Sequence, residues 1–135
     1  MKLQKILLAA LAAGIAVNIY DFLLHDVVLQ GPLYSHLTSF FRADASLPLV
    51  VLSDFVAALV FACVYERVQG AFPAGPKGGA TFGLYAGVLV GFPTWIMCNL
   101  LITGFTYELA WAWTLAGLGW GPIAGACVGW VYRTP

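Results

Sequence analysis

Four polar residues that could carry chemistry lie inside long apolar stretches of this 135-residue chain. Asn18, Asp21 and His25 are spaced by three and four residues, which places them on one face of a helix. Asp54 lies inside the next apolar stretch. An ionisable group in hydrocarbon costs at least about 2.5 to 3.5 kcal/mol, so such groups normally face a bundle interior or a water-filled cavity.

Two further polar residues are expected at a comparable depth. Asn99 lies near the end of the third apolar stretch, and Glu108 lies at the start of the fourth. If the stretches cross a membrane in alternating directions, all of these residues fall in the outer half of the bilayer. The hypothesis is a small polar pocket open to the outer side, formed by Asn18, Asp21, His25, Asp54, Asn99 and Glu108.

Such a cluster could serve three purposes. Asp21, His25 and Asp54 could bind a divalent cation such as zinc, manganese or iron, or a polar ligand, although no compact metal motif such as HExxH is present. Asp21 and Asp54 could instead carry protons in a small transporter. The third interpretation is structural, with the polar side chains hydrogen-bonded across helices to fix the register of the bundle.

The sequence identifies no cofactor. A haem held by two histidines within this chain is not expected, because the only histidines are His25 and His36, and His36 is predicted to lie on the surface. Cys63, Cys98 and Cys127 lack CxxC spacing and are expected to be small buried apolar residues, with a redox pair of Cys63 and Cys127 as the alternative. No nucleophile motif, P-loop or dinucleotide fingerprint is present, so a non-enzymatic role is predicted.

The composition requires a membrane protein. The chain is 61% hydrophobic and 9% charged, and its mean hydropathy is +0.89. Four apolar stretches are each long enough to cross a bilayer as a helix, near residues 4–29, 47–68, 79–103 and 107–132. Period-2 alternation is missing, which excludes a membrane barrel. We therefore predict an all-α fold, a single membrane domain spanning residues 1–135.

The connections predict how the four spans are arranged. Gly31-Pro32 ends the first span, and apolar residues at helical spacing between 33 and 42 predict a short interfacial helix on the outer surface. Only residues 104–106 join the third and fourth spans, so these two must be antiparallel neighbours. The prediction is an antiparallel four-helix transmembrane bundle with an outer aromatic belt that includes Tyr34 and Trp113.

Glycine recurs at every fourth position in both arms of the predicted hairpin. Such small-xxx-small rows let helix backbones approach closely in a membrane, where the hydrophobic effect no longer drives helices together. The rows could pack within the chain, or they could form the face of a homo-oligomer. They consist of Gly79, Gly83, Gly87 and Gly91 in one arm and Gly117, Gly121, Gly125 and Gly129 in the other.

The positive charges predict the orientation, because Lys and Arg are retained on the cytoplasmic side. Arg42 is the only one on the predicted outer side. Cytoplasmic N- and C-termini are therefore expected, although the basic start and following apolar run could also be a signal peptide. The formal net charge of zero gives no reason to expect a nucleic-acid partner. The five cytoplasmic charges are Lys2, Lys5, Arg67, Lys77 and Arg133.

Three runs of residues carry a family resemblance. They are Asn18 to His25 with the pattern N-x-x-D-x-x-x-H, the turn Gly31-Pro32-Leu33-Tyr34, and Gly79 to Gly87. The chain resembles a group of uncharacterised small four-span bacterial membrane proteins with these features. The resemblance implies a bacterial inner (plasma) membrane location and no particular activity. The expected function is an accessory or structural subunit of a larger membrane complex, and the alternative is a bundle that binds or transports a ligand or ion.

Overall fold

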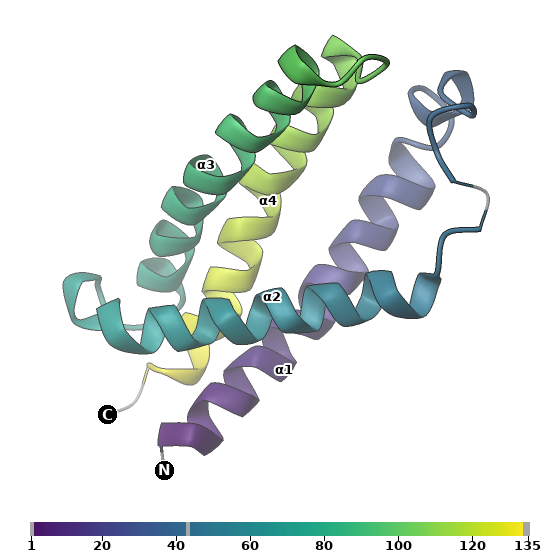
Figure 1. The fold of residues 1–135 in the computed structure, drawn as a ribbon. Coiled ribbons are helices and arrows are strands. Elements are labelled where there is room, and N and C mark those ends of the chain that lie inside the picture. The colour runs from purple at the N-terminus through teal and green to yellow at the C-terminus, as the bar shows by residue number, and fades with distance from the viewer. Residues whose placement is uncertain (1, 43, 134–135) are drawn as a thin grey trace.

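Four long helices make up the protein in the computed structural model, which describes residues 2–42 and 44–133 (Figure 1). All four are long and apolar enough to cross a membrane, and the described residues form no strand. This confirms the predicted all-α class with four spans. The helices are α1 (Lys2–Asp21), extended by a π-helical segment η1 (Phe22–Val28), then α2 (Leu47–Val68), α3 (Pro76–Leu101) and α4 (Tyr107–Val131).

Local sequence explains where several helices begin and end. Pro48 and Pro76 lie in the first turns of α2 and α3, where a missing N–H costs nothing. Thr106 caps α4 by accepting a hydrogen bond from the Leu109 N–H at 3.2 Å. Gly104 adopts φ +90° in the α3–α4 turn, a conformation that disfavours side chains. The turn is therefore as tight as the sequence predicts.

The helices alternate in direction between two ends of the bundle. The start of α1 and the end of α4 lie at one end, here called the terminal end (Figure 1). The α1–α2 connection and the α3–α4 turn lie at the other, here called the distal end. Helices α3 and α4 form a closely packed hairpin, α1 packs against both α2 and α4, and α2 crosses α1 obliquely. The predicted antiparallel four-helix bundle is confirmed.

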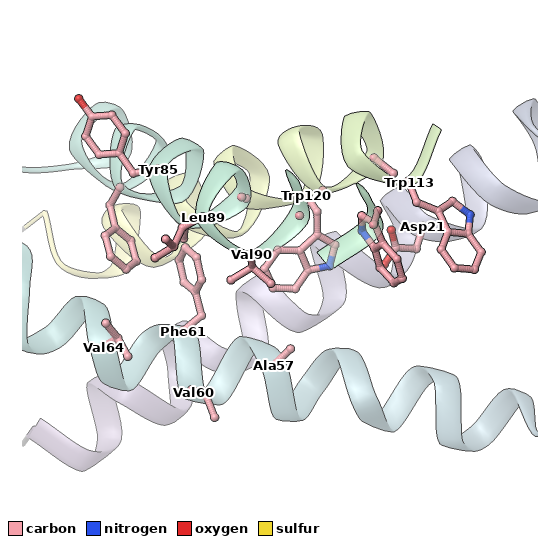
Figure 2. Close-up of a pocket in the computed structure, with 18 of the residues that line it drawn as sticks. Asp21, Ala57, Val60, Phe61, Val64, Tyr85, Leu89, Val90, Trp113 and Trp120 are labelled. Carbon is pink, nitrogen blue, oxygen red and sulfur yellow. The ribbon is translucent and has the colours of Figure 1, made fainter. Parts of the chain in front are cut away.

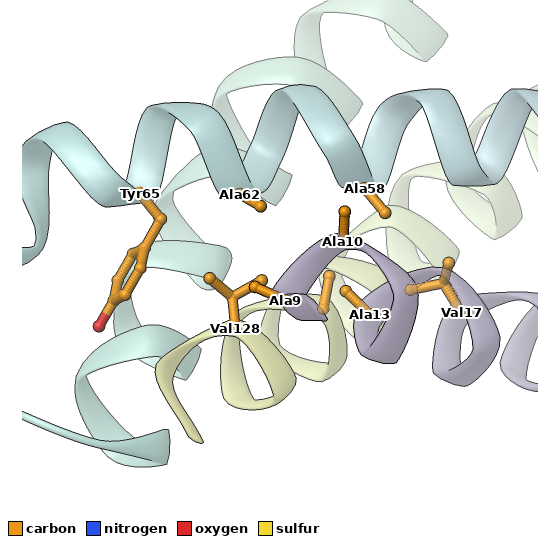
Figure 3. Close-up of a cluster of buried hydrophobic side chains, with 9 residues drawn as sticks. Ala9, Ala10, Ala13, Val17, Ala58, Ala62, Tyr65 and Val128 are labelled. Atoms are coloured by element: carbon orange, nitrogen blue, oxygen red, sulfur yellow. The ribbon is translucent and has the colours of Figure 1, made fainter. Parts of the chain in front are cut away.

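Small side chains form the core between α1, α2 and α4 (Figure 3). Ala9 and Ala13 of α1 and Ala58 and Ala62 of α2 are completely buried. Val128 of α4 closes the same cluster. Alanine lets the helices approach closely without leaving voids, which is the usual basis of helix association in membranes.

The repeated glycines lie along the contact between α3 and α4. A Cβ added at Gly79 or Gly83 would overlap the carbonyl oxygen of the facing glycine, Gly125 or Gly121. Gly87, Gly91, Gly117 and Gly129 continue the same contact, with looser spacing at Gly91 and Gly117. The rows therefore face each other within the chain rather than outward.

The connection between α1 and α2 is less regular than a helix. Its only helical element in the described residues is a 3-10 turn, η2 (Tyr34–His36). Apolar side chains nevertheless hold the connection against the distal end of the hairpin, where the Phe40 ring lies 5.6 Å from that of Phe105. The predicted interfacial helix is thus a single turn that packs on the bundle.

Candidate binding groove

A groove of about 970 Å³ lies between α2 and the α3–α4 hairpin (Figure 2). Phe61 of α2 points toward α3, and Trp120 of α4 borders the same space. The walls are almost entirely apolar, and the remaining wall residues include Ala57, Val60, Val64, Leu89 and Val90. This groove is a partly open space that could hold a ligand.

Aromatic rings keep α2 away from α3 near the terminal end. The Phe61 ring meets the Phe82 ring edge-on at 4.8 Å, and it lies 5.9 Å from Trp120. The Tyr65 ring lies 5.3 Å from Phe82. Rings of this size separate two helices that would touch if these positions were alanine or glycine. The groove is therefore a consequence of side-chain volume.

The polar end of the groove comes from α1. Asp21 and His25 both line it, and their side chains are 25% and 30% exposed. The Asp21 Oδ1 lies 4.0 Å from the His25 Nε2. The helix changes from α to π immediately after Asp21, so the pair spans this change. Single π-helical turns inside longer helices often occur at functional sites.

A hydrogen-bonded chain links this pair to α4. The Trp113 indole N–H donates to the Tyr34 hydroxyl at 2.8 Å, and the same hydroxyl bonds the His25 Nδ1. An indole can only donate, so the Tyr34 oxygen accepts from Trp113, while the bond between the Tyr34 hydroxyl and His25 Nδ1 can run in either direction, depending on the tautomer of the ring. The other ring nitrogen, Nε2, is the one that faces Asp21. We call Asp21, His25, Tyr34 and Trp113 the polar chain.

Asp54 is a further acidic residue near the polar chain, whereas Arg42 and Asp44 lie outside the spans. The Asp54 carboxyl group on α2 is near enough to Asp21 to act on it electrostatically, and the Trp120 side chain also interacts with Asp21. Arg42 pairs with Asp44 at 2.9 Å outside the spans, and this guanidinium holds the pKa of the Asp44 carboxyl below its usual range. The groove end therefore has two nearby carboxylates.

Three residues predicted for the polar cluster do not join it. The Asn18 amide donates to the Gly14 carbonyl of its own helix at 2.8 Å. The Asn99 amide donates to the Phe105 carbonyl at 2.7 Å and so stabilises the α3–α4 turn. Glu108 is exposed at the start of α4. Asp21 and His25 do come together, with Asp54 as a nearby charge.

The three-ligand metal site is not assembled. Within residues 2–42 and 44–133, no three His, Cys, Asp or Glu side chains lie close enough together to hold a metal ion. Asp21 and His25 supply two groups, and Asp54 does not complete a set with them. Cys63, Cys98 and Cys127 are all free thiols.

Sequence reasoning did not assign Tyr34, Trp113 and Trp120 to the site. Tyr34 and Trp113 were interpreted as members of an aromatic belt, although each has a polar atom that needs a partner when buried. The turn Gly31-Pro32-Leu33-Tyr34 was the available signal, because it returns Tyr34 to the depth of His25. Trp120 had no comparable signal, since its position depends on how α4 packs.

Comparison with protein-family models, with curated proteins and with solved structures finds no match.

Proposed function

We propose that this protein binds a small, largely apolar molecule within the bilayer, in the groove between α2 and the α3–α4 hairpin. The volume of about 970 Å³ carries this proposal, because ligand sites typically measure about 300 to 1,000 Å³ and combine apolar walls with a few polar groups. The polar chain supplies such groups at one end. The ligand would place its polar part beside Asp21 and His25 and its apolar part between Phe61 and Val90.

We further propose a bacterial inner-membrane location with cytoplasmic termini. The argument is the excess of Lys and Arg at the terminal end, which the positive-inside rule assigns to the cytoplasm. In this orientation Asp21 and His25 lie in the outer half of the bilayer. A ligand would then reach the polar end from the outer side or from the surrounding lipid.

Native mass spectrometry of the mildly extracted protein tests the binding proposal. We expect a small-molecule adduct of defined stoichiometry on the wild type. Ala57→Trp, which fills the groove from α2, should remove the adduct. Its neighbour Val56 is 53% exposed and does not line the groove, so Val56→Trp is the matched control and should retain it. An unmodified wild-type mass, or equal adducts on both variants, would overturn the proposal.

A second candidate function is that of an accessory subunit. It is favoured by the low burial of α2 and α3. In the most apolar 18-residue stretch of each helix, only 11% of α2 and 6% of α3 is buried within the protein. Another chain could pack on these faces, although lipid covers them equally well. In the same spectra, stable masses that include other proteins would favour this candidate over ligand binding.

A further inference from the structure

The groove has an acidic side chain at its polar end and no basic side chain among its described lining residues. Asp21 lines it, and no Lys or Arg is found among its lining residues in the described part of the chain. Lys2 lies at the terminal end, 3.4 Å from Glu66, and Arg42 is paired with Asp44 outside the spans. A phosphate or carboxylate headgroup would therefore meet repulsion rather than a counter-charge at this site.

The histidine beside Asp21 is not in hydrogen-bond contact with the carboxyl group. Its Nδ1 is bonded to the Tyr34 hydroxyl, and its Nε2 lies 4.0 Å from the Asp21 Oδ1. Asp54 adds a second carboxylate that acts on Asp21. The polar end of the groove therefore has one acidic residue in its wall and a second nearby, with no Lys or Arg among the lining residues in the described part of the chain.

Three indole rings surround this end of the groove. Trp95, Trp113 and Trp120 all line it, and Trp113 and Trp120 lie beside Asp21 (Figure 2). The Trp113 N–H is used within the protein by Tyr34, and the Trp120 side chain interacts with Asp21. Their ring faces are what remain for a ligand, and the face of an indole attracts a positive charge.

We propose that the ligand is a lipophilic organic cation. Its positive centre would lie between the Asp21 carboxylate and the tryptophan rings, and its apolar groups would fill the groove toward Phe61 and Val90. The cation would supply the counter-charge that a carboxylate in an apolar site requires. This inference rests on the proposed function, because it assigns the ligand class of the same groove.

Two hydrophobic ions of matched shape and opposite charge test the inference. We would measure equilibrium binding of tetraphenylphosphonium and tetraphenylborate to the full-length protein in nanodiscs of neutral lipid, with empty nanodiscs as the blank. We expect saturable binding of the phosphonium and at least about tenfold weaker binding of the borate. Asp21→Asn should weaken phosphonium binding by a similar factor, and Ala57→Trp should abolish it.

The outcomes separate this inference from the proposed function. Saturable binding of both ions, or phosphonium binding unchanged by Asp21→Asn, would overturn the cation assignment while the groove remained a binding site. If Ala57→Trp and Val56→Trp bind the phosphonium equally strongly, the cation assignment and the proposed binding groove are both overturned. If Asp21→Asn fails to fold, Trp95→Leu in the same assay replaces it, because loss of the ring face should weaken phosphonium but not borate.

Discussion

The two sides of α3 meet the rest of the protein in opposite ways. On one side, Gly79 and Gly83 lie so close to α4 that backbone contacts backbone. On the other side, Leu89 and Val90 border an open groove and are 75% and 64% exposed. Both sides are apolar, so hydrophobicity does not distinguish them. In a membrane, the volume of the side chains decides whether helices close on each other or stay apart.

The contact between α1 and α2 lies between these extremes. It is made of alanines such as Ala13 and Ala58, which allow close packing but still separate the backbones by a methyl group. The distance between helices thus increases with side-chain size. Glycine lies at the close α3–α4 contact, alanine at the α1–α2 contact, and phenylalanine between α2 and α3, where the groove lies. Substitutions at these packing contacts, or at the polar contacts beside them, test how the bundle is held together.

The largest effect is expected at the closed side of α3. Gly83→Ala would drive a Cβ into the Gly121 carbonyl oxygen, and such overpacking should cost about 1 to 3 kcal/mol. Gly91→Ala, in the same helix, places its Cβ at an ordinary contact of 3.7 Å from the Thr114 carbonyl oxygen. It should be neutral. Both variants can be unfolded with dodecyl sulfate in mixed micelles and followed by circular dichroism. Equal losses in the free energy of unfolding would contradict the close contact at Gly83.

The next effect is expected at the distal end, where Tyr34 joins the groove to the α1–α2 connection. Tyr34→Phe removes the acceptor of the Trp113 N–H and the partner of the His25 Nδ1. Leaving a part-buried donor unpaired should cost about 1 to 2 kcal/mol. Amide hydrogen exchange should accelerate in residues 29–42. Tyr107→Phe, at a tyrosine that is 65% exposed, is the control and should not change the exchange.

The same tyrosine gives a pH dependence. Burial raises the pKa of the Tyr34 phenol above its ordinary value of about 10. The unfolded chain therefore loses this proton at a lower pH than the folded chain. The resulting stabilisation is fully present below about pH 10 and is lost as the pH rises through the folded-state pKa. Thermal unfolding of wild type between neutral and strongly alkaline pH should show this loss, and Tyr34→Phe should remove that part of it.

A smaller effect is expected where α1 is anchored to α4. The Tyr20 hydroxyl donates to the Ala116 carbonyl at 3.0 Å. Hydrogen bonds between membrane helices contribute about 0.6 kcal/mol on average, so Tyr20→Phe should destabilise the bundle by about that amount. Tyr85→Phe, at a ring that is 63% exposed, serves as its control in the same unfolding assay. A loss with Tyr85→Phe as large as that with Tyr20→Phe would argue against this anchor.

The smallest effect is expected at the terminal end. The Tyr132 hydroxyl is buried and has no hydrogen-bond partner among the described residues. Removing an unsatisfied buried hydroxyl costs nothing and can stabilise. Tyr132→Phe should therefore leave the stability unchanged or slightly raise it, in contrast to Tyr34→Phe. A destabilisation equal to that of Tyr34→Phe would show that the two tyrosines do not differ as described.

Much of the fold follows from simple sequence signals. The four apolar stretches predicted the four spans, and the short link between Leu101 and Tyr107 predicted the hairpin. The glycine rows predicted where backbones approach, because a four-residue period is a property of the chain itself. The groove was beyond such reasoning, since it depends on how rings such as Phe61 and Phe82 meet across α2 and α3.

The candidate site was predictable only in part. The spacing of Asp21 and His25 placed them on one helix face, and the structure brings them together. Asn18 shares the helix face of Asp21 and His25, and Asn99 lies at a comparable depth, yet their amides donate to nearby carbonyls. Depth along a helix can be read from sequence, whereas the partner that a side chain selects depends on packing. The hydrogen-bond partners of Tyr34 likewise depend on packing.

Photocrosslinking in native membranes shows whether the open side of α3 binds a small molecule. A diazirine-bearing leucine would replace Leu89, which lines the groove and is 75% exposed, or Leu100, which is 69% exposed and does not line it. We expect a low-mass adduct from Leu89 that Leu100 lacks, with phospholipid captured at Leu100. Identical lipid products at both positions, or a crosslink from Leu89 to another protein, would contradict the proposed binding.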